Sequence, residues 1–399
     1  MYSLTRIIIS ATLLVISYQS PSIAAEKSHD AVVNFDSGIG NTPSNEGDPD
    51  YQQYIQQYFS HYHALGASSS PPFKDFNAEY DAQGIPKWFD GDTGEYTLKM
   101  LVIRLYAKEQ FDDLEKLLAD WNNSKNRKAD GKWKLVAFTN GLSMRFDNGG
   151  WDADYQIIKH WRQKYPQSAG AAIAESLYWS RYAWNARGSG FADSVSEAGW
   201  KLFKDRIEKA GRILVESESY ASNNPEWFAQ FLMVAKAVSW PKESLLKLSA
   251  KATQRHPYYY PIYYATLQAL SPAWGGDWKN TDDFIRQSSA QTKDQEGLAL
   301  YARLYMAASA CAGCTEKFNL FRDTKASWPE MKKGFEDLIR QYPHSLWNLN
   351  KYASFACQAG DKTSYQAVRF RIGNNLIPGA WRSNYSTDLC DHQFPSQQL

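Results

Sequence analysis

Apolar residues recur at three- and four-residue steps over most of this chain, and no other feature constrains its fold as strongly. Leu98, Leu101, Val102 and Leu105 share one helical face, and residues 111–121 repeat that spacing after a short break. These two segments predict a pair of amphipathic helices joined by a turn. Alternating apolar and polar stretches of strand length are nearly absent, so the sequence predicts an all-α protein.

Capping signals predict where several helices begin. A serine followed three residues later by glutamate has the spacing of a capping box, and a proline directly after the cap suits the first helical turn. The signals are Ser194 with Glu197, Ser327 with Glu330, which enclose Pro329, and Asn224 before Pro225.

Three segments of the chain resemble one another. Each is an amphipathic helix, then an aromatic residue or histidine directly before a proline, then another helix; the prolines are Pro166, Pro257 and Pro343. They are too widely spaced for one unit of about 34 residues, which indicates several helices per segment. We therefore expect an irregular α-solenoid of stacked helix pairs, similar in style to tetratricopeptide repeats. An irregular all-α globule is the alternative.

The N-terminus has the anatomy of a signal peptide. Arg6 precedes the apolar run 7–16, and the small-x-small sequence that ends at Ala24 predicts cleavage between Ala24 and Ala25. Ten apolar residues are too few to span a bilayer, and no later run approaches about 20. We expect a periplasmic or secreted bacterial protein with no membrane span after signal removal.

The rest of the chain divides by composition. Residues 25–50 carry six acidic residues and one lysine, with little that could pack, so a flexible acidic leader is expected. A helical-repeat domain over 51–382 and a C-terminal tail over 383–399 complete the predicted organisation.

Charge and motifs exclude several functional classes. The chain has 44 Lys and Arg against 43 Asp and Glu, and Arg6 is the only charged residue in the signal, so the mature charge is balanced. Nucleic-acid binding is not expected, because it needs a basic excess. HExxH, GxSxG, Walker and dinucleotide-binding patterns do not occur. The sequence thus implies no catalytic residue, metal or cofactor, and whether the protein is an enzyme stays open.

The four cysteines favour disulfides. An even number in an exported chain is typical of oxidised pairs, and the residues are Cys311, Cys314, Cys357 and Cys390. Three connectivities are open. A redox role for the CAGC pair, a metal site that uses Cys390 with His392, and free thiols are the alternatives.

Aromatic residues make up 15% of the chain, and two clusters of them are candidate binding sites. In the first, aromatic rings crowd a helix end beside an arginine and a helix start, where a carboxylate or phosphate could be bound; the residues are Trp179, Tyr182, Trp184, Arg187 and Ser194. In the second, Trp274 and Trp278 flank a glycine pair. The structural alternatives are that Arg187 caps the last helix carbonyls and ties down the loop that follows, and that the tryptophans staple a turn.

Acidic residues offer two weaker candidates. The segment 147–154, DNGGWDAD, has carboxylates suited to Ca²⁺ but lacks the spacing of an EF-hand loop, so a solvated turn is the simpler interpretation. A glycosidase-like acid pair would have to lie among the helical Glu and Asp residues, such as Glu175 and Glu197. The simpler interpretations are that Glu197 belongs to a helix cap and that Glu175 is a charge on a helix surface.

Segments between Tyr96 and Trp381 resemble a known bacterial family in the same order along the chain. They include AWNARGSGFADSVSEAGWKLF, NPEWFAQFLMVA, RHPYYYPIYYATLQALSPAWGGDW and GFEDLIRQYPHSLWNLNKYASFACQAGD. The chain resembles domain-of-unknown-function family 4034, which comprises exported helical-repeat proteins. The resemblance implies a tetratricopeptide-like fold and no established activity.

Two functions follow as hypotheses. The first is a noncatalytic binding or scaffold module of the cell envelope, with an envelope protein as partner or a glycan as ligand, since solenoids offer extended concave surfaces. The second is an envelope enzyme that acts on glycans or peptidoglycan fragments.

Overall fold

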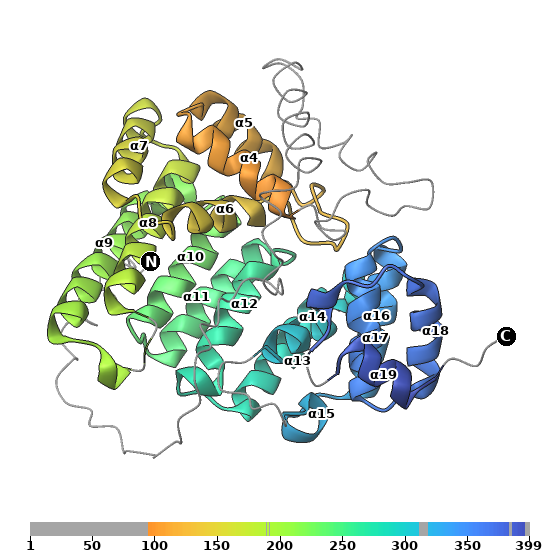
Figure 1. Ribbon diagram of the computed structural model, residues 1–399. Coiled ribbons are helices and arrows are strands. Elements are labelled where there is room, and N and C mark those ends of the chain that lie inside the picture. The colour runs from red at the N-terminus through yellow and green to blue at the C-terminus, as the bar shows by residue number, and fades with distance from the viewer. Residues whose placement is uncertain (1–94, 189, 191, 311–317, 383–384, 396–399) are drawn as a thin grey trace.

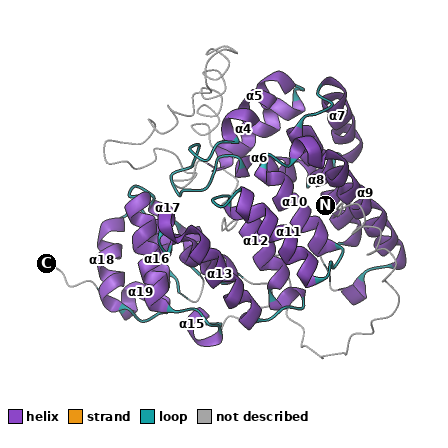
Figure 2. Ribbon diagram, turned by 180° about the vertical axis from the view of Figure 1, so that it is seen from behind, coloured by secondary structure: helices purple, strands orange, loops and turns teal. Residues whose placement is uncertain are grey.

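A computed structural model describes residues 95–395, apart from 189, 191, 311–317 and 383–384. The predicted signal peptide, the acidic leader and the start of the repeat domain lie outside the described residues. Within the described ranges the chain contains helices and loops, and no strand is formed (Figure 2). The all-α prediction is confirmed.

The α-helices are α4 (Glu95–Ala107), α5 (Phe111–Trp121), α6 (Val136–Phe146), α7 (Trp151–Lys164), α8 (Ala169–Arg187), α9 (Glu197–Ala221), α10 (Pro225–Ala237), α11 (Lys242–Arg255), α12 (Tyr260–Leu270), α13 (Trp278–Glu296), α14 (Ala299–Ala308), α15 (Leu320–Asp323), α16 (Trp328–Gln341), α17 (Leu346–Gln358), α18 (Lys362–Ile372) and α19 (Thr387–Gln393). Three short 3-10 helices are η4 (Ala192–Ser194), η5 (Pro272–Trp274) and η6 (Pro378–Ala380).

The helices are stacked as pairs, as expected for a solenoid. From α4 to α16 the long even-numbered helices pack on one another in sequence order, and α5, α7, α9, α11 and α13 lie beside this row (Figure 1). The distribution of apolar residues explains which helices lie within the row and which lie beside it. Helices α10 and α14 are buried on nearly every side, whereas α5 buries a single stripe of Phe111, Leu114, Leu117, Leu118 and Trp121.

The three similar segments form the same helix junction. Tyr165, His256 and Tyr342 each end a helix with φ near −130° (−130°, −132° and −128°), and their N–H groups each donate to the carbonyl four residues earlier at 2.8 Å. Each is followed by proline, which excludes a further helical turn because its ring disfavours the α region for the preceding residue. The predicted correspondence of the three junctions is confirmed.

Helix α12 links the two halves of the core. Ile262 and Ala265 pack into a core formed with α4–α11, while Tyr260, Tyr263 and Leu267 pack into a core formed with α13–α19. The two faces of one helix therefore belong to two successive cores, which is the stacking expected of a solenoid.

Two capping predictions need correction. The cap of α9 is Ser196, whose hydroxyl accepts from the Gly199 N–H at 3.1 Å, whereas Ser194 ends the 3-10 turn η4. Ser327 does precede α16, but its side chain accepts no cap hydrogen bond. Asn224 caps α10 as predicted, accepting from the Glu226 N–H at 3.0 Å.

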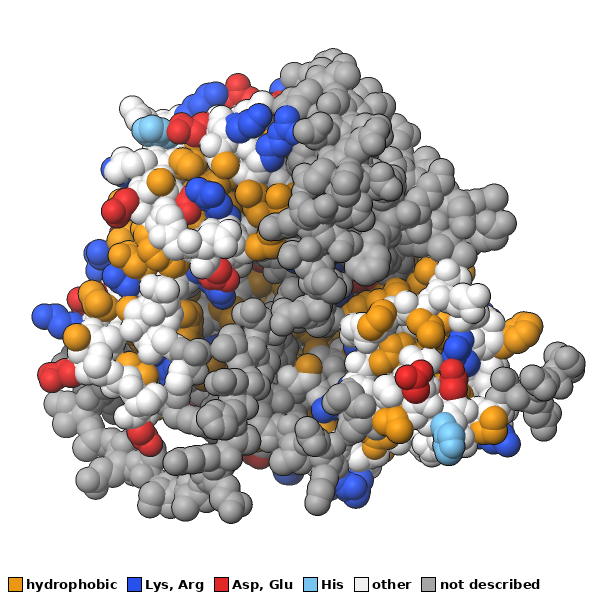
Figure 3. All heavy atoms as spheres, viewed as in Figure 1, with side chains coloured by type: hydrophobic (Ala, Val, Ile, Leu, Met, Phe, Trp, Pro, Cys, Tyr) orange, Lys and Arg blue, Asp and Glu red, His pale blue; other side chains and the backbone are white. Residues whose placement is uncertain are grey.

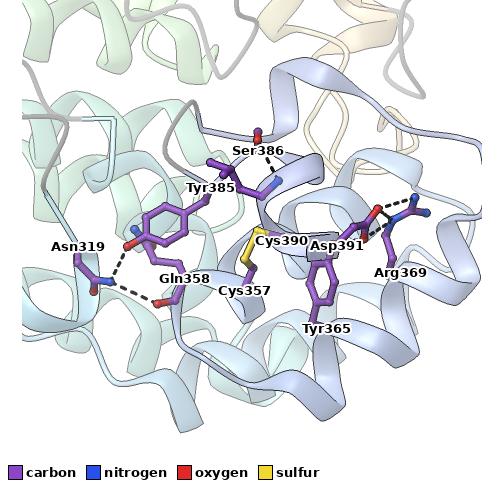
Figure 4. The surroundings of a disulfide bond; sticks show 10 residues. Asn319, Cys357, Gln358, Tyr365, Arg369, Tyr385, Ser386, Cys390 and Asp391 are labelled. Atoms are coloured by element: carbon purple, nitrogen blue, oxygen red, sulfur yellow. Dashed lines mark hydrogen bonds and ion pairs between the residues drawn. A yellow bond between two sulfur atoms is a disulfide. The ribbon is translucent and has the colours of Figure 1, made fainter. Parts of the chain in front are cut away.

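A disulfide joins Cys357 in α17 to Cys390 in α19 (Figure 4). Part of the segment predicted as a tail is thus a helix attached to the core. Asp391 adds an ion pair with Arg369 at 3.1 Å and accepts from the Tyr365 hydroxyl. The zinc alternative for Cys390 is wrong, because its sulfur is bonded to Cys357. Cys311 and Cys314 lie outside the described residues.

Candidate binding site

Helix α8 sends its aromatic side chains to two different places. Trp179 and Tyr182 lie against α7: the Tyr182 ring stacks on Trp151 with centroids 4.4 Å apart, and Trp179 meets Tyr155 edge-on at 5.3 Å. Trp184, further along α8, points to a separate cluster with α9 and η5, in which Phe203 meets its ring at 5.0 Å.

Cations from α9 cover the first group of rings. The Arg206 guanidinium lies 3.3 Å from the Tyr182 ring centroid and donates to the Tyr182 carbonyl at 2.8 Å. The Lys209 ammonium lies 4.3 Å from the Trp179 centroid. Both rings are half-buried between the packed helices, so these contacts stabilise the α8–α9 pair.

The second group brings together the two predicted aromatic clusters. Trp184 meets Trp274 of η5 edge to face, with centroids 6.0 Å apart and planes at 86°. The Trp274 side chain is 39% exposed, which is unusual for so large an apolar residue. We call the group formed by Trp184, Trp200, Phe203, Trp274, Arg187 and Lys236 the Trp184–Trp274 cluster.

The glycine pair is what allows Trp274 to reach this position. Gly275 has φ +78°, in the left-handed region that residues with a Cβ rarely adopt. At Gly276 a Cβ would overlap the Leu270 carbonyl. The predicted turn is confirmed, and it presents Trp274 without covering it.

Lys236 of α10 lies beneath Trp274. Its ammonium is 4.0 Å from the Trp274 ring centroid and donates to the Gln268 side-chain carbonyl. The residue is 6% exposed, and burial lowers its pKa to about 7. Within the described ranges no carboxylate pairs with Lys236, so its positive charge is solvated only by an amide and an aromatic face.

Arg187 ties down the loop after α8, as the structural alternative supposed, but it does so through loop carbonyls and not through the helix carbonyls that were expected. It donates to the carbonyls of Gly188 at 3.1 Å and Gly190 at 2.9 Å, and its guanidinium lies over the Trp184 and Trp200 rings at 5.4 and 5.3 Å. It therefore holds the loop after α8 against the cluster.

Two predicted residues lie apart from this cluster. The exposed Ser194 does not begin α9. Trp278, the first residue of α13, stacks on Phe318 with centroids 6.0 Å apart and contributes to the second core. The two tryptophans around the glycine pair therefore do not form a clamp.

The acidic candidates are engaged by arginines. Asp147 pairs with Arg181, and Asp154 is fully buried with Arg145 at 3.0 Å. In the part of the chain that the structure covers, no group of three or more His, Cys, Asp or Glu residues is arranged to hold a metal ion.

Glu175 and Glu197 do not form an acid pair. Glu175 binds Arg162 at 3.3 Å, and Glu197 lies in the first turn of α9. Gly199 of that turn lies against Ala186, which places Glu197 about 16 Å along α8 from Glu175 at about 1.5 Å per residue. Glycosidase carboxylates are about 5 to 10 Å apart.

Sequence reasoning missed Lys236, and a signal for it was present. The run 231–240, FLMVAKAVSW, is apolar except for this lysine and one serine. A lysine inside a helix that is apolar on all sides must be buried, and a buried lysine is rare unless paired. In contrast, only the tertiary fold brings its neighbour Gln268 to it.

The balance of charge extends over the visible surface. On the face in Figure 3, Lys and Arg are interspersed with Asp and Glu among apolar side chains. None of the helices that the structure describes combines the length and apolar character needed to cross a bilayer.

Residues 99–240 match the model of a protein family described as Domain of unknown function (DUF4034). The match confirms the expected resemblance for this part of the chain; from residue 241 to Trp381 the resemblance stays a prediction. Trp184, Arg187 and Lys236 lie inside the matched range, and Trp274 lies outside it. No curated protein and no solved structure matches the chain.

Proposed function

We propose that this chain, whose residues 99–240 match the DUF4034 family model, is a noncatalytic binding protein of the bacterial cell envelope. The binding surface is the Trp184–Trp274 cluster. One observation carries the proposal: a 39% exposed tryptophan lies above a buried lysine with no carboxylate partner among the described residues.

The chemistry of the cluster indicates its ligand. Trp274 offers a rigid ring at low entropic cost, which suits an apolar or planar group of the ligand. Lys236 and Arg187 supply positive charge. A carboxylate that approached Lys236 would stabilise its charged form and offset part of its desolvation. We propose a protein partner that inserts an acidic side chain beside an apolar one.

Two observations support export. The sequence begins with signal-peptide anatomy. The Cys357–Cys390 disulfide is the kind of bond that persists in oxidising compartments, such as the periplasm or the extracellular medium.

Binding can be tested with matched surface variants. The mature protein is immobilised and exposed to detergent-solubilised envelope of the producing bacterium, and retained proteins and glycans are identified by mass spectrometry. Trp274→Ala removes the proposed platform. Phe370→Ala is the control, because Phe370 is 81% exposed on α18 and lies outside the cluster.

We expect a saturable protein partner that is retained by the wild type and by Phe370→Ala, and at least about tenfold less by Trp274→Ala, since aromatic anchors commonly contribute 2 kcal/mol or more, roughly thirtyfold, to binding. Equal retention by both variants would place binding elsewhere. Retention of glycan fragments followed by their conversion would favour the enzyme hypothesis instead.

A further inference from the structure

The loop between α5 and α6, residues 122–135, crosses to the second half of the fold (Figure 1). The Asp130 carbonyl accepts hydrogen bonds from Arg303 of α14 and from Asn348 of α17, the latter at 3.4 Å. On the same loop, Arg127 donates to the Tyr260 hydroxyl at 3.2 Å. The loop is therefore fixed to three helices that are distant in sequence.

This loop brings Lys132 into a group of cations from the second half. Lys132 lies 3.5 Å from the Asp130 carboxylate, which is fully buried. Burial alone would raise the pKa of the Asp130 carboxyl, but the neighbouring lysines and Arg303 outweigh it and lower that pKa to about 2. The carboxylate is thus held ionised by an excess of positive charge.

Lys351 of α17 is the centre of the group. Its ammonium lies 4.9 Å from the Trp347 ring centroid and 3.5 Å from the Gly379 carbonyl. Burial lowers its pKa to about 7, and repulsion from Lys132 and Arg382 adds to this effect. Part of the side chain nevertheless remains accessible to solvent. A desolvated and still accessible ammonium can receive a ligand.

Arg382 completes the group. It donates to the Ser309 carbonyl at 2.7 Å, and its guanidinium lies 5.4 Å from the Phe318 ring centroid. Burial lowers its pKa, although Arg382 also stays partly accessible. Tyr264 of α12 is half-buried, and the charges of Arg303 and Lys132 act on its hydroxyl.

The positive charges exceed the negative ones. Within the described part of the chain, Lys351 and Arg382 form no ion pair, and Lys132 pairs only with Asp130. Cations placed close together away from bulk water repel one another, and this arrangement costs free energy unless an anion compensates it. A carboxylate brings one charge. A phosphate monoester brings a charge of about −1.5 to −2 at pH 7 and three acceptor oxygens, which suits three cations better.

We propose that Lys132, Lys351 and Arg382 form a binding site for a phosphate group, separate from the Trp184–Trp274 cluster. The phosphate is either inorganic phosphate or the monoester end of a larger molecule. Both forms present the same oxygens to the cations, and the experiment distinguishes them.

The site can be tested by isothermal titration calorimetry of the mature protein at pH 6.5 and constant ionic strength. The probes are inorganic phosphate, glycerol 1-phosphate and acetate. Lys351→Met and Arg382→Gln each remove one cation of the site, and circular dichroism confirms that both variants are folded. Lys362→Met is the control for net charge, because Lys362 is exposed on α18.

We expect saturable phosphate binding by the wild type and by Lys362→Met. Each site variant should bind phosphate with an affinity at least roughly tenfold lower, as expected for loss of one charged contact. Tighter binding of glycerol 1-phosphate than of phosphate would identify a monoester as the natural ligand form, and the reverse would identify the free ion. The proposal is overturned by absence of saturable binding, by acetate binding equal to phosphate, or by equal affinities in all variants.

Sulfate gives a second readout, since it does not titrate between pH 6 and 8. Its affinity for the wild type should fall as pH rises over this range, because Lys351 loses its proton, and the fall should be smaller in Lys351→Met. The other charged or titratable groups that act on Lys351 or on its neighbours are Lys132, Arg382, Asp130, Arg303 and Tyr264. An identical pH profile in both proteins contradicts a role for Lys351.

Discussion

Removal of the Cys357–Cys390 disulfide should lower the free energy of unfolding by about 3 to 4 kcal/mol. The bond closes a loop with a sequence separation of 33 residues. A crosslink across such a loop reduces the entropy of the unfolded chain by about 12 cal/mol/K, which gives this value at 25 °C. Both cysteines are buried, at 2% and 0% exposure, so the folded state provides a well-packed site for the bond.

The other contacts of α19 cannot replace the bond. The Arg369–Asp391 ion pair is partly exposed, with side chains 23% and 39% accessible. Such pairs contribute about 0 to 1 kcal/mol. Helix α19 has only seven residues, and a helix of this length is not stable alone in water. We therefore expect α19 to lose its structure first when the disulfide is absent.

The assay compares the wild type with the Cys357→Ala/Cys390→Ala double variant in urea unfolding followed by circular dichroism. Hydrogen exchange of residues 387–393 is measured in parallel. Both proteins are measured without and with reductant. The change that reductant causes in the double variant can act only through Cys311 and Cys314, and it is subtracted from the change that reductant causes in the wild type. A loss of stability below about 1 kcal/mol, or α19 amides that stay protected, would refute the reasoning.

Three further substitutions test other parts of the fold. Gly131→Ala places a Cβ at φ +89° against the Tyr342 ring, so we expect a loss of about 2 to 4 kcal/mol in urea unfolding, and an unchanged midpoint would contradict the loop position. Burial raises the folded-state pKa of Glu226 from 4.5 to about 7. Its contribution to the free energy of unfolding is therefore fully present below pH 4.5 and is lost, by about 3 kcal/mol, as the pH rises through 7. Glu226→Gln should flatten this decline in melting temperatures between pH 5 and 8.5, and parallel curves for the two proteins would show that Glu226 does not ionise there. Ser196→Ala should lower the free energy of unfolding by about 1 kcal/mol through loss of the α9 cap, and Ser194→Ala should lower it by less in the same thermal melts. A larger loss for Ser194→Ala would support the capping box predicted from the sequence.

The fold was accessible to sequence reasoning because its determinants are local. Each helix carries its own apolar stripe, and each proline stops its helix by the same steric conflict, so Pro166, Pro257 and Pro343 mark real junctions. The error at Ser194 has a local cause too. Ser194 and Ser196 both precede α9. The three-residue spacing to Glu197 favours Ser194, but the hydroxyl that accepts from a free N–H of the helix belongs to Ser196.

The binding site was only partly accessible. The aromatic load pointed to Trp184 and to Trp274, but the contact between them depends on how α8, α10 and α12 stack. No spacing rule connects residues so far apart in the chain. The same limitation applies to the Lys351 group, where Lys132 comes from a loop between α5 and α6 and Arg382 from the C-terminal end.

The Trp184–Trp274 cluster and the Lys351 group share one feature. In each, a charged side chain is buried among helices that otherwise pack through apolar residues. Glu226 shows the usual resolution, because burial raises its pKa to about 7 and keeps it largely neutral below that pH, while the Tyr259 hydroxyl donates a hydrogen bond to it. Lys236 and Lys351 lack a carboxylate among the described residues and lie instead against Trp274 and Trp347. A lysine that served packing alone could be replaced by methionine or leucine with a gain in stability. An anionic ligand bound at either lysine would compensate the charge that the fold leaves unpaired, which is why we place the two proposed binding sites there.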